Sequence, residues 1–459
     1  MSRRKNTSID MTRGPIAGPL VLFILPLIGT SIFQILYNTV DFLFVGNFLD
    51  KTAAAAVGAS ATLVSCTVGL FTGISVGTSV VAAQAIGAGK KQKAEDTIHT
   101  SAAFGAVGGV VIMLIAMIFA PAILRALNTP EQVIPQALVY LRIYVLGVPA
   151  TVVYNMIAGG MRAYGNSEKP FRVLCMSGIL NVLLDALFVV VLPFGVAGVS
   201  AATAISQTVA AILIIYMASR KENDIRFSLS KLKIDLPLLG NVLKIGLPSG
   251  IQTIIVTISN IFVQYYINDF GETAVAAFAT YYKVECLIYI PILAFGQAAT
   301  TFAGQNLGAG HFKRIRRGVT AIAVFGSAII CVLSFVILHF RYGVFGWFMK
   351  DGEVVENALR IAGVTFPLYF IYPIMETAGG AVRGMGHSLA SMIIVIVNMC
   401  VIRVSLLAYF SAHYHTIEAL ARVYPITWAG AMVCFIIVFA VMIGRLCRTE
   451  SGGGDLPRI

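Results

Sequence analysis

The amino-acid sequence predicts an all-α membrane protein with twelve transmembrane helices in two pseudo-symmetric bundles of six. Three observations predict this fold class: the composition, the spacing of long apolar runs, and a similarity between the two halves of the chain. Of the 459 residues, 58% are hydrophobic and only 12% are charged, and the mean hydropathy is +0.85. A soluble protein of this length needs a more charged surface, so we expect the chain to lie in a lipid bilayer.

The long apolar runs give the number of helices. A helix that crosses a bilayer needs about 20 mostly apolar residues. Twelve segments satisfy this requirement, roughly 16–46, 53–86, 98–120, 136–158, 172–192, 196–218, 238–268, 274–307, 317–340, 357–380, 389–411 and 420–445.

The positions of Lys and Arg predict the orientation. With the N-terminus placed inside, 24 of the 33 basic residues lie in inner segments and 5 in outer segments. This bias predicts a multi-pass protein of the plasma membrane (a cell inner membrane) with both termini in the cytoplasm. It also argues against nucleic-acid binding as the reason for the net charge of +12, because these residues serve as orientation signals and contacts for anionic lipids.

The two halves of the chain match at a nearly constant offset. Pro26 corresponds to Pro248 at a shift of 222, and Arg162 corresponds to Arg383 at a shift of 221. Because each half has an even number of helices, both halves enter the membrane from the same side. They are therefore expected to be parallel repeats with a substrate site at their interface.

The one long polar connection lies between the halves, at residues 220–235. It predicts four parts: an N-terminal bundle over 1–220, a cytoplasmic linker over 221–236, a C-terminal bundle over 237–450 and a tail over 451–459.

Two acids inside the apolar segments are the strongest candidates for function. Asp41 is the one acidic or basic residue of the first apolar run, and a carboxylate there is costly enough to indicate a functional site. Asp185 is the second acid, and Asn181 lies one turn before it on the same helix face. At about 1.5 Å per residue, Asp41, Asp185 and Thr203 lie at similar depths on three helices.

Such a cluster suits a small cation. Two neighbouring carboxylates repel each other, so that one of them can carry a proton. The oxygens of Asp41, Asn181 and Asp185 could instead bind sodium. For each polar group, Thr203 included, a structural hydrogen bond between or within helices is the alternative.

Weaker candidates for contacts with a substrate are polar or acidic residues elsewhere in the apolar segments. A role in packing or in a buried ion pair is an equally good explanation for them. They are Gln34, Tyr37 and Asn38 near Asp41 on the first helix, and Glu285 and Glu376 on helices eight and ten.

Other functional classes find little support. The seven cysteines are scattered singly and the six histidines are dispersed, which argues against disulfides, a firm metal site and a membrane enzyme. No GxxxxGK[ST] motif is present, so ATP-driven transport by this chain is not expected. We expect no catalytic residues and no cofactor, with a monomer as the default oligomeric state.

Several motifs together resemble one family. The opening Gln34-Ile-Leu-Tyr-Asn38-Thr-Val-Asp41 resembles that of the multidrug and toxic compound extrusion (MATE) family. The runs Gln305-Asn-Leu-Gly-Ala-Gly310 and Gln84-Ala-Ile-Gly-Ala-Gly89 look like its signature after helices eight and two. The resemblance covers essentially the whole chain and is greatest to the bacterial branch with its acids in the N-terminal half.

This resemblance implies a V-shaped pair of six-helix bundles and secondary antiport by alternating access. An amphipathic, cationic organic compound would leave the cell while a proton or sodium ion enters. The motif match implies a cation-site role for Asp41, Asn181, Asp185 and, more weakly, Thr203.

A flippase for a lipid-linked precursor, with related architecture, is the alternative function. It would need a cationic cavity with several Arg or Lys residues inside the spans. Only Lys283 and Arg403 are candidates deep in the spans, which weakens this alternative.

Overall fold

Apolar helices make up nearly all of the computed structural model, which describes residues 8–126, 128–220 and 225–451. The described residues contain no β-strand. The helices before residue 220 are α1 (Ala17–Phe48), α2 (Lys51–Gly87), α3 (Lys91–Ala126), α4 (Ile134–Tyr144), α5 (Val148–Ala163), α6 (Glu168–Asp185) and α7 (Val196–Ser219). The later helices are α8 (Leu236–Asn268), α9 (Glu272–Gly308), α10 (Phe312–His339), α11 (Arg341–Gly346), α12 (Gly352–Thr365), α13 (Ile371–Gly384), α14 (Ser388–Ile396), α15 (Arg403–His413) and α16 (Ile417–Ser451).

Five shorter helical pieces connect or extend these elements. Three are 3₁₀-helices, η1 (Val145–Gly147), η3 (Leu229–Lys231) and η4 (Phe366–Leu368). Two are π-helices, η2 (Ala186–Val191) and η5 (Val397–Ile402).

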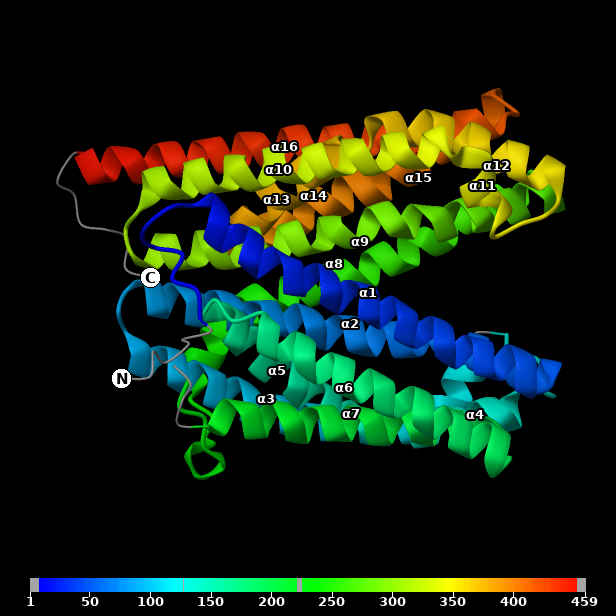
Figure 1. Ribbon diagram of the computed structural model, residues 1–459, viewed down its shortest axis with the longest axis horizontal. Coiled ribbons are helices and arrows are strands. Elements are labelled where there is room, and N and C mark those ends of the chain that lie inside the picture. The colour runs from blue at the N-terminus through cyan, green and yellow to red at the C-terminus, as the bar shows by residue number, and fades with distance from the viewer. Residues whose placement is uncertain (1–7, 127, 221–224, 452–459) are drawn as a thin grey trace. The chain divides into compact units, whose positions relative to one another are not determined.

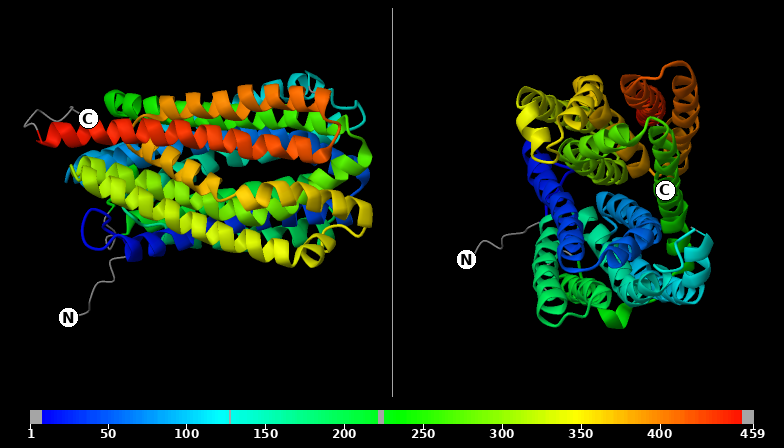
Figure 2. Two further views of the ribbon diagram at one scale, coloured as in Figure 1. Left: turned by 90° about the horizontal axis from the view of Figure 1, so that it is seen from above. Right: turned by 90° about the vertical axis from the view of Figure 1, so that its right-hand side faces the viewer.

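The predicted number of spans is confirmed. Among the described residues, eleven helices are long and apolar enough to cross a membrane. A twelfth span results when the pair Gly352–Leu368 and Ile371–Gly384, bent by 54°, is counted as one. Within each unit the long helices run side by side (Figure 1, Figure 2).

The chain forms two compact units, and two helices are divided between them. Unit 1 comprises Leu25–Gly250 and the described residues before Met11, whereas unit 2 comprises Met11–Ile24 and the described residues from Ile251 onward. The division therefore falls inside α1 and inside α8. It lies within two residues of Pro26 and Pro248, and a proline inside a helix removes one backbone hydrogen bond.

The predicted repeat is present in the secondary structure. α2 and α9 both contain 37 residues. Each is followed by a glycine with positive φ, Gly89 at 72° and Gly310 at 73°. This left-handed conformation ends a helix and carries almost no penalty for glycine.

The repeat also extends to close helix contacts. A Cβ atom on Gly159 of α5 would lie 2.8 Å from the carbonyl oxygen of Ser75 on α2. The equivalent atom on Gly380 of α13 would lie 2.3 Å from the carbonyl oxygen of Gly296 on α9. Both pairs are related by the shift of 221, so each unit uses a glycine to bring the same two helices into backbone contact.

Gln305 and Asn306, at the end of α9, form hydrogen bonds with the N-terminal segment of unit 2. Gln305 Oε1 accepts a hydrogen bond from the Met11 amide at 3.2 Å, and Asn306 Nδ2 donates to the Met11 carbonyl at 3.1 Å. The guanidinium of Arg314 on α10 donates to the carbonyl oxygens of Met11 and Gly14, at 3.1 and 2.8 Å. We call Met11–Gly14 the N-terminal strap.

Candidate functional site

Asp41 lies near the end of α1 and contacts α7 within unit 1. Its Oδ2 accepts a hydrogen bond from the hydroxyl of Thr203 at 3.3 Å. The same hydroxyl lies 3.0 Å from the carbonyl oxygen of Val199, so one hydroxyl proton serves two acceptors. The other Asp41 oxygen, Oδ1, is buried and has no hydrogen-bond partner among the described residues.

Asp185 and Asn181, which are both on α6, lie beside Asp41. Both side chains are fully buried, at 0% exposure, and both interact with Asp41. In the described part of the chain, none of their four side-chain oxygen and nitrogen atoms has a hydrogen-bond partner of ordinary geometry. Native proteins rarely leave buried polar groups without partners, so this cluster is suited to a proton or a cation.

The backbone at Asp185 is also unusual. Asp185 is the last residue of α6, and the π-helix η2 follows it directly. Single π turns inside helices occur frequently at functional sites. Here the wider turn begins immediately after the buried acid.

Three further polar residues border the cluster and were not predicted from the sequence. Tyr140 and Tyr144 of α4 stack at 5.9 Å between ring centroids and lie within electrostatic reach of Asp41. Gln207 of α7 donates to the Tyr144 hydroxyl at 3.3 Å. The available sequence signals were the Tyr-x-x-x-Tyr spacing and a glutamine one turn after Thr203, and both are common in packed helices.

The chemistry of this cluster favours a hard cation or a proton. Its donors are two carboxylates, one amide and one hydroxyl, all of which supply oxygen. Oxygen ligands suit hard cations, whereas transition metals prefer imidazole or thiolate. No group of three or more His, Cys, Asp or Glu residues suited to a metal occurs in the described chain.

The weaker candidates on α1 differ in their positions. Tyr37 lies one turn before Asp41 and close to Thr203, and its buried hydroxyl has no partner among the described residues. Gln34 is exposed. Asn38 lies within α1, but its side chain is outside the part that the structure describes.

Glu285 lies in an aromatic cluster of unit 2. Its Oε1 accepts hydrogen bonds from the hydroxyls of Tyr281, at 3.1 Å, and Tyr369, at 2.8 Å. The Tyr369 ring lies 4.6 Å from Trp428 between centroids. Arg403 is within electrostatic reach of Glu285, but the two form no direct ion pair in the described chain.

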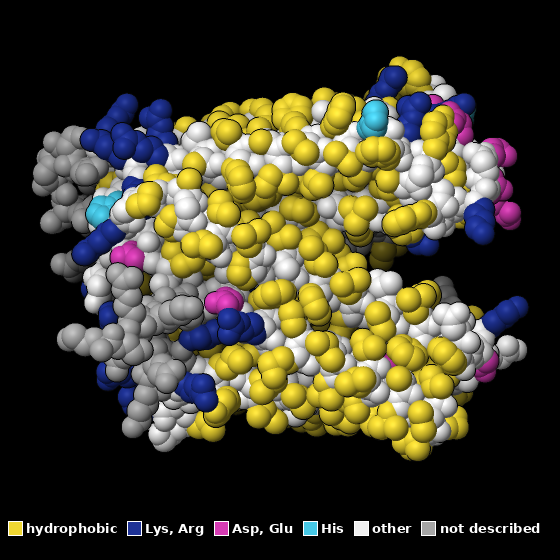
Figure 3. All heavy atoms as spheres, in the orientation of Figure 1, with side chains coloured by type: hydrophobic (Ala, Val, Ile, Leu, Met, Phe, Trp, Pro, Cys, Tyr) yellow, Lys and Arg dark blue, Asp and Glu magenta, His cyan; other side chains and the backbone are white. Residues whose placement is uncertain are grey.

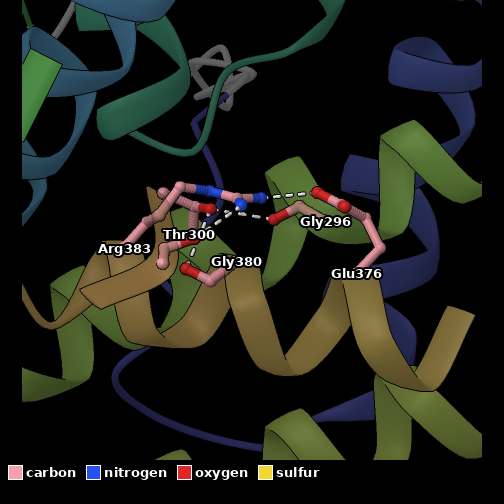
Figure 4. A network of polar contacts seen from close by, with 6 residues as sticks. Gly296, Thr300, Glu376, Gly380 and Arg383 are labelled. Atoms are coloured by element: carbon pink, nitrogen blue, oxygen red, sulfur yellow. Dashed lines mark hydrogen bonds and ion pairs between the residues drawn. The ribbon is translucent and has the colours of Figure 1, made fainter. Parts of the chain in front are cut away.

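Glu376 is paired with an arginine side chain. It forms an ion pair with Arg383, seven residues later on α13, and both side chains are mostly buried. Figure 4 shows the two side chains pointing toward each other beside Gly296 and Thr300 of α9. Thr300 donates to the carbonyl oxygens of Gly296 and Gly380, at 2.9 and 3.0 Å, so this region is closely packed.

Comparison with known proteins gives the family. The MatE family profile matches residues 26–187 and 248–410. This chain belongs to the MatE family. The two matched stretches begin 222 residues apart, so the MatE match also confirms the internal repeat.

Relatives and solved structures agree with the MatE assignment. The chain is 29% identical over 433 residues to the probable multidrug resistance protein YoeA of Bacillus subtilis, covering 92% of each chain. It is 20% identical over 390 residues to the multidrug export protein MepA of Staphylococcus aureus, covering 85% of this chain and 86% of that one.

Two solved structures share the fold. One is a MATE protein in complex with MaL6, with a TM-score of 0.90, 22% identity, and coverage of 98% of this chain and 100% of that one. The second is a MOP superfamily transporter from Pyrococcus furiosus, described by a reversed polarity of its binding pocket that suggests a different function. It has a TM-score of 0.89, 22% identity, and coverage of 96% and 98%. The MatE chain is thus a multi-pass membrane protein of a multidrug efflux transporter family, and its relatives are transporters rather than enzymes.

Proposed function

We propose that this MatE protein is a secondary antiporter of the plasma membrane that exports amphipathic, cationic organic compounds in exchange for protons or sodium ions. The observation that carries the proposal is the buried pair of Asp41 and Asp185. Family membership supports transport, and the names of the relatives in Bacillus and Staphylococcus support drugs as the substrate class.

The coupling argument starts from Asp185. An ionised carboxylate that is fully buried without a hydrogen-bond partner is unfavourable, and a proton or sodium ion removes that cost. Asp41 responds to the same event, because an ionised Asp41 accepts the Thr203 hydrogen bond and a protonated one does not need it. The cation thereby changes which contacts α1 makes with α6 and α7.

Exchange follows when the cation and the substrate favour different conformations. A ligand shifts a conformational equilibrium only through its different affinities for the two states. We propose that cation binding to Asp41, Asn181, Asp185 and Thr203 favours the state that releases substrate outside. Loss of the cation to the cytoplasm would restore the state that binds substrate.

The proposed substrate contacts lie on α9 and α13 of unit 2 and on α1. Glu285 suits an organic cation, because its carboxylate lies among tyrosine rings that can also attract positive charge. Glu376 suits one less well, since Arg383 already compensates its charge. Gln34, Tyr37 and Asn38 would contact the substrate from α1.

The orientation and the oligomeric state complete the proposal. The excess of Lys and Arg in alternate connections supports cytoplasmic termini. A monomer is proposed by default. The flippase alternative gains no support from Arg403, because this buried guanidinium contacts the Thr427 hydroxyl at 3.3 Å and the Tyr424 ring at 5.1 Å.

The test is efflux of the cationic dye ethidium from cells or vesicles under separately imposed proton and sodium gradients. One gradient is expected to drive efflux, and Asp41→Asn and Asp185→Asn are expected to abolish the response to it. Asp269→Asn, in an exposed turn, is the matched control and should retain the response. If both variants of the buried pair respond to the gradient like the wild type, the coupling role is wrong.

A further inference from the structure

We propose that unit 2 carries a binding site for an anionic phospholipid on the lipid-facing surface of α10, α13 and α16. These helices enclose a groove of about 450 Å³. Binding pockets for small molecules are of about 300–1,000 Å³. None of the nine described residues that line the groove is charged.

The groove is open at the surface of these helices. Its rim includes Val324 of α10 and Ile436 of α16, which are 64% and 42% exposed. Its floor includes Val319 and Ala378, which are 4% and 5% exposed. Large exposed apolar side chains on membrane-spanning helices face acyl chains, so lipid is the natural occupant of this groove.

Two basic side chains, Lys313 and Arg317, lie on the same face of α10 beyond the end of the groove. Lys313, Arg317, Thr320, Val324 and Ser327 follow one another at spacings of four and three residues, which places them on one side of the helix. Both cations are exposed, and neither forms an ion pair with another described residue. Figure 3 shows Lys and Arg side chains gathered at helix ends, beside the hydrophobic surface.

The dimensions fit one lipid. The groove follows α10 for about 12 Å, from Val319 to Ser327. One half of a bilayer's hydrocarbon core is about 15 Å thick. A phospholipid with its phosphate beside Lys313 and Arg317 would therefore place one of its acyl chains in the groove.

In the first repeat, protein covers the corresponding face of α3. We therefore expect a lipid at this position in unit 2 but not in unit 1. Thr320 corresponds to His99 of α3 at the shift of 221. The His99 ring stacks on Phe227 at 4.9 Å and accepts a hydrogen bond from the Ser228 amide at 3.0 Å. Phe227 is only 3% exposed, so the described part of the linker at Phe227 and Ser228 covers this face in unit 1.

The charges differ in the same way. Lys313 and Arg317 correspond to Gln92 and Asp96, which are hydrogen-bonded to each other at 3.1 Å. The first repeat thus has an acid and an amide where the second has two cations. Anionic lipids are attracted to basic residues beside membrane helices, and the attraction is worth about fivefold in affinity for each cation. The positive charges of Lys313 and Arg317 therefore favour an anionic phospholipid over a neutral one.

Native mass spectrometry of the purified full chain tests the proposal. The protein is incubated with equal amounts of phosphatidylglycerol and phosphatidylethanolamine that have the same acyl chains. The wild type should retain phosphatidylglycerol preferentially. Lys313→Gln with Arg317→Gln should reduce that preference by about fivefold for each cation removed. Lys90→Gln with Lys91→Gln removes the same charge just before and at the start of α3 and should leave the preference unchanged.

A second variant tests the groove itself. Ala323→Phe places a ring in the groove and should reduce retention of both lipids, with no change in charge. The proposal fails if the Lys313 and Arg317 variant keeps the wild-type preference, or if the Lys90 and Lys91 control loses it equally. It also fails if removal of residues 452–459 increases lipid retention, because the chain's own tail would then be the occupant.

Discussion

The hydroxyl of Thr203 on α7 donates a hydrogen bond to Asp41 on α1, 162 residues away in the sequence. Because the Val199 carbonyl accepts from the same hydroxyl, Thr203 keeps an acceptor when Asp41 changes its protonation or ligand. This bond therefore gives a direct way to identify the coupling ion.

Thr203→Val removes the hydroxyl and keeps the side-chain shape. If sodium is the coupling ion, the site loses an oxygen ligand, and half-maximal efflux should require more sodium. If the proton is the coupling ion, ionised Asp41 loses a donor worth about 1.5–3 kcal/mol, and half-maximal efflux should require fewer protons. Ethidium efflux is measured against each cation concentration.

The control for this experiment is Thr208→Val. Thr208 lies on the same helix and, among the described residues, donates only to the Ala204 carbonyl, at 2.8 Å. An unchanged cation requirement in Thr203→Val would show that this hydroxyl takes no part in coupling.

Asp185→Asn separates function from stability. The substitution keeps the shape and removes a buried carboxylate that has no hydrogen-bond partner of ordinary geometry in the described chain, so stability should not fall. Gradient-driven efflux should be lost. Thermal unfolding in detergent and dye efflux are measured on the same preparation, and a fall in Tm of several degrees would indicate a structural role instead.

Glu285→Gln tests the aromatic cluster of unit 2. The amide can still accept from Tyr281 and Tyr369, so the fold should be retained, but the negative charge is lost. Because one attractive charge is lost, we expect KM for cationic dyes to rise by about tenfold. KM for neutral substrates should change little. Equal changes for both classes would argue against a charge-selective contact.

Arg314→Gln tests the N-terminal strap. The guanidinium holds the carbonyls of Met11 and Gly14, so its loss should destabilise the strap by about 1–3 kcal/mol. Hydrogen exchange at the Met11 amide should then be faster. Arg316→Gln, at an exposed position two residues later, is the matched control, and equal exchange in both variants would contradict the assignment.

Gly380→Ala tests the backbone contact between α13 and α9. The added Cβ would lie 2.3 Å from the Gly296 carbonyl oxygen, so the helices must separate, at a cost of about 1–3 kcal/mol or more. Gly363→Ala in α12 meets no atom within 4 Å and should stabilise slightly, by about 0.5–1 kcal/mol. Unfolding of both variants in detergent measures the difference.

The sequence predicted the features that local chemistry determines. Apolar run lengths predicted the spans, and counting residues from helix ends placed Asp41 and Thr203 at similar depths. It did not predict Tyr144 or Gln207, because uncharged polar residues are common in helices and only packing brings these two to the acid. The strap was missed for another reason: Gln305 and Asn306 bind backbone atoms, which no pattern of side chains reveals.

The division of α1 and α8 between the units has a consequence for the origin of the chain. Unit 1 includes the first part of α8, and unit 2 includes the strap and the first part of α1. A chain cut at the linker would separate each unit from a segment that completes it. A single repeat could therefore complete its fold only with a second copy that supplied this segment, which is a domain-swapped dimer. Fusion of two such copies would explain why each unit includes a segment from the other side of the linker.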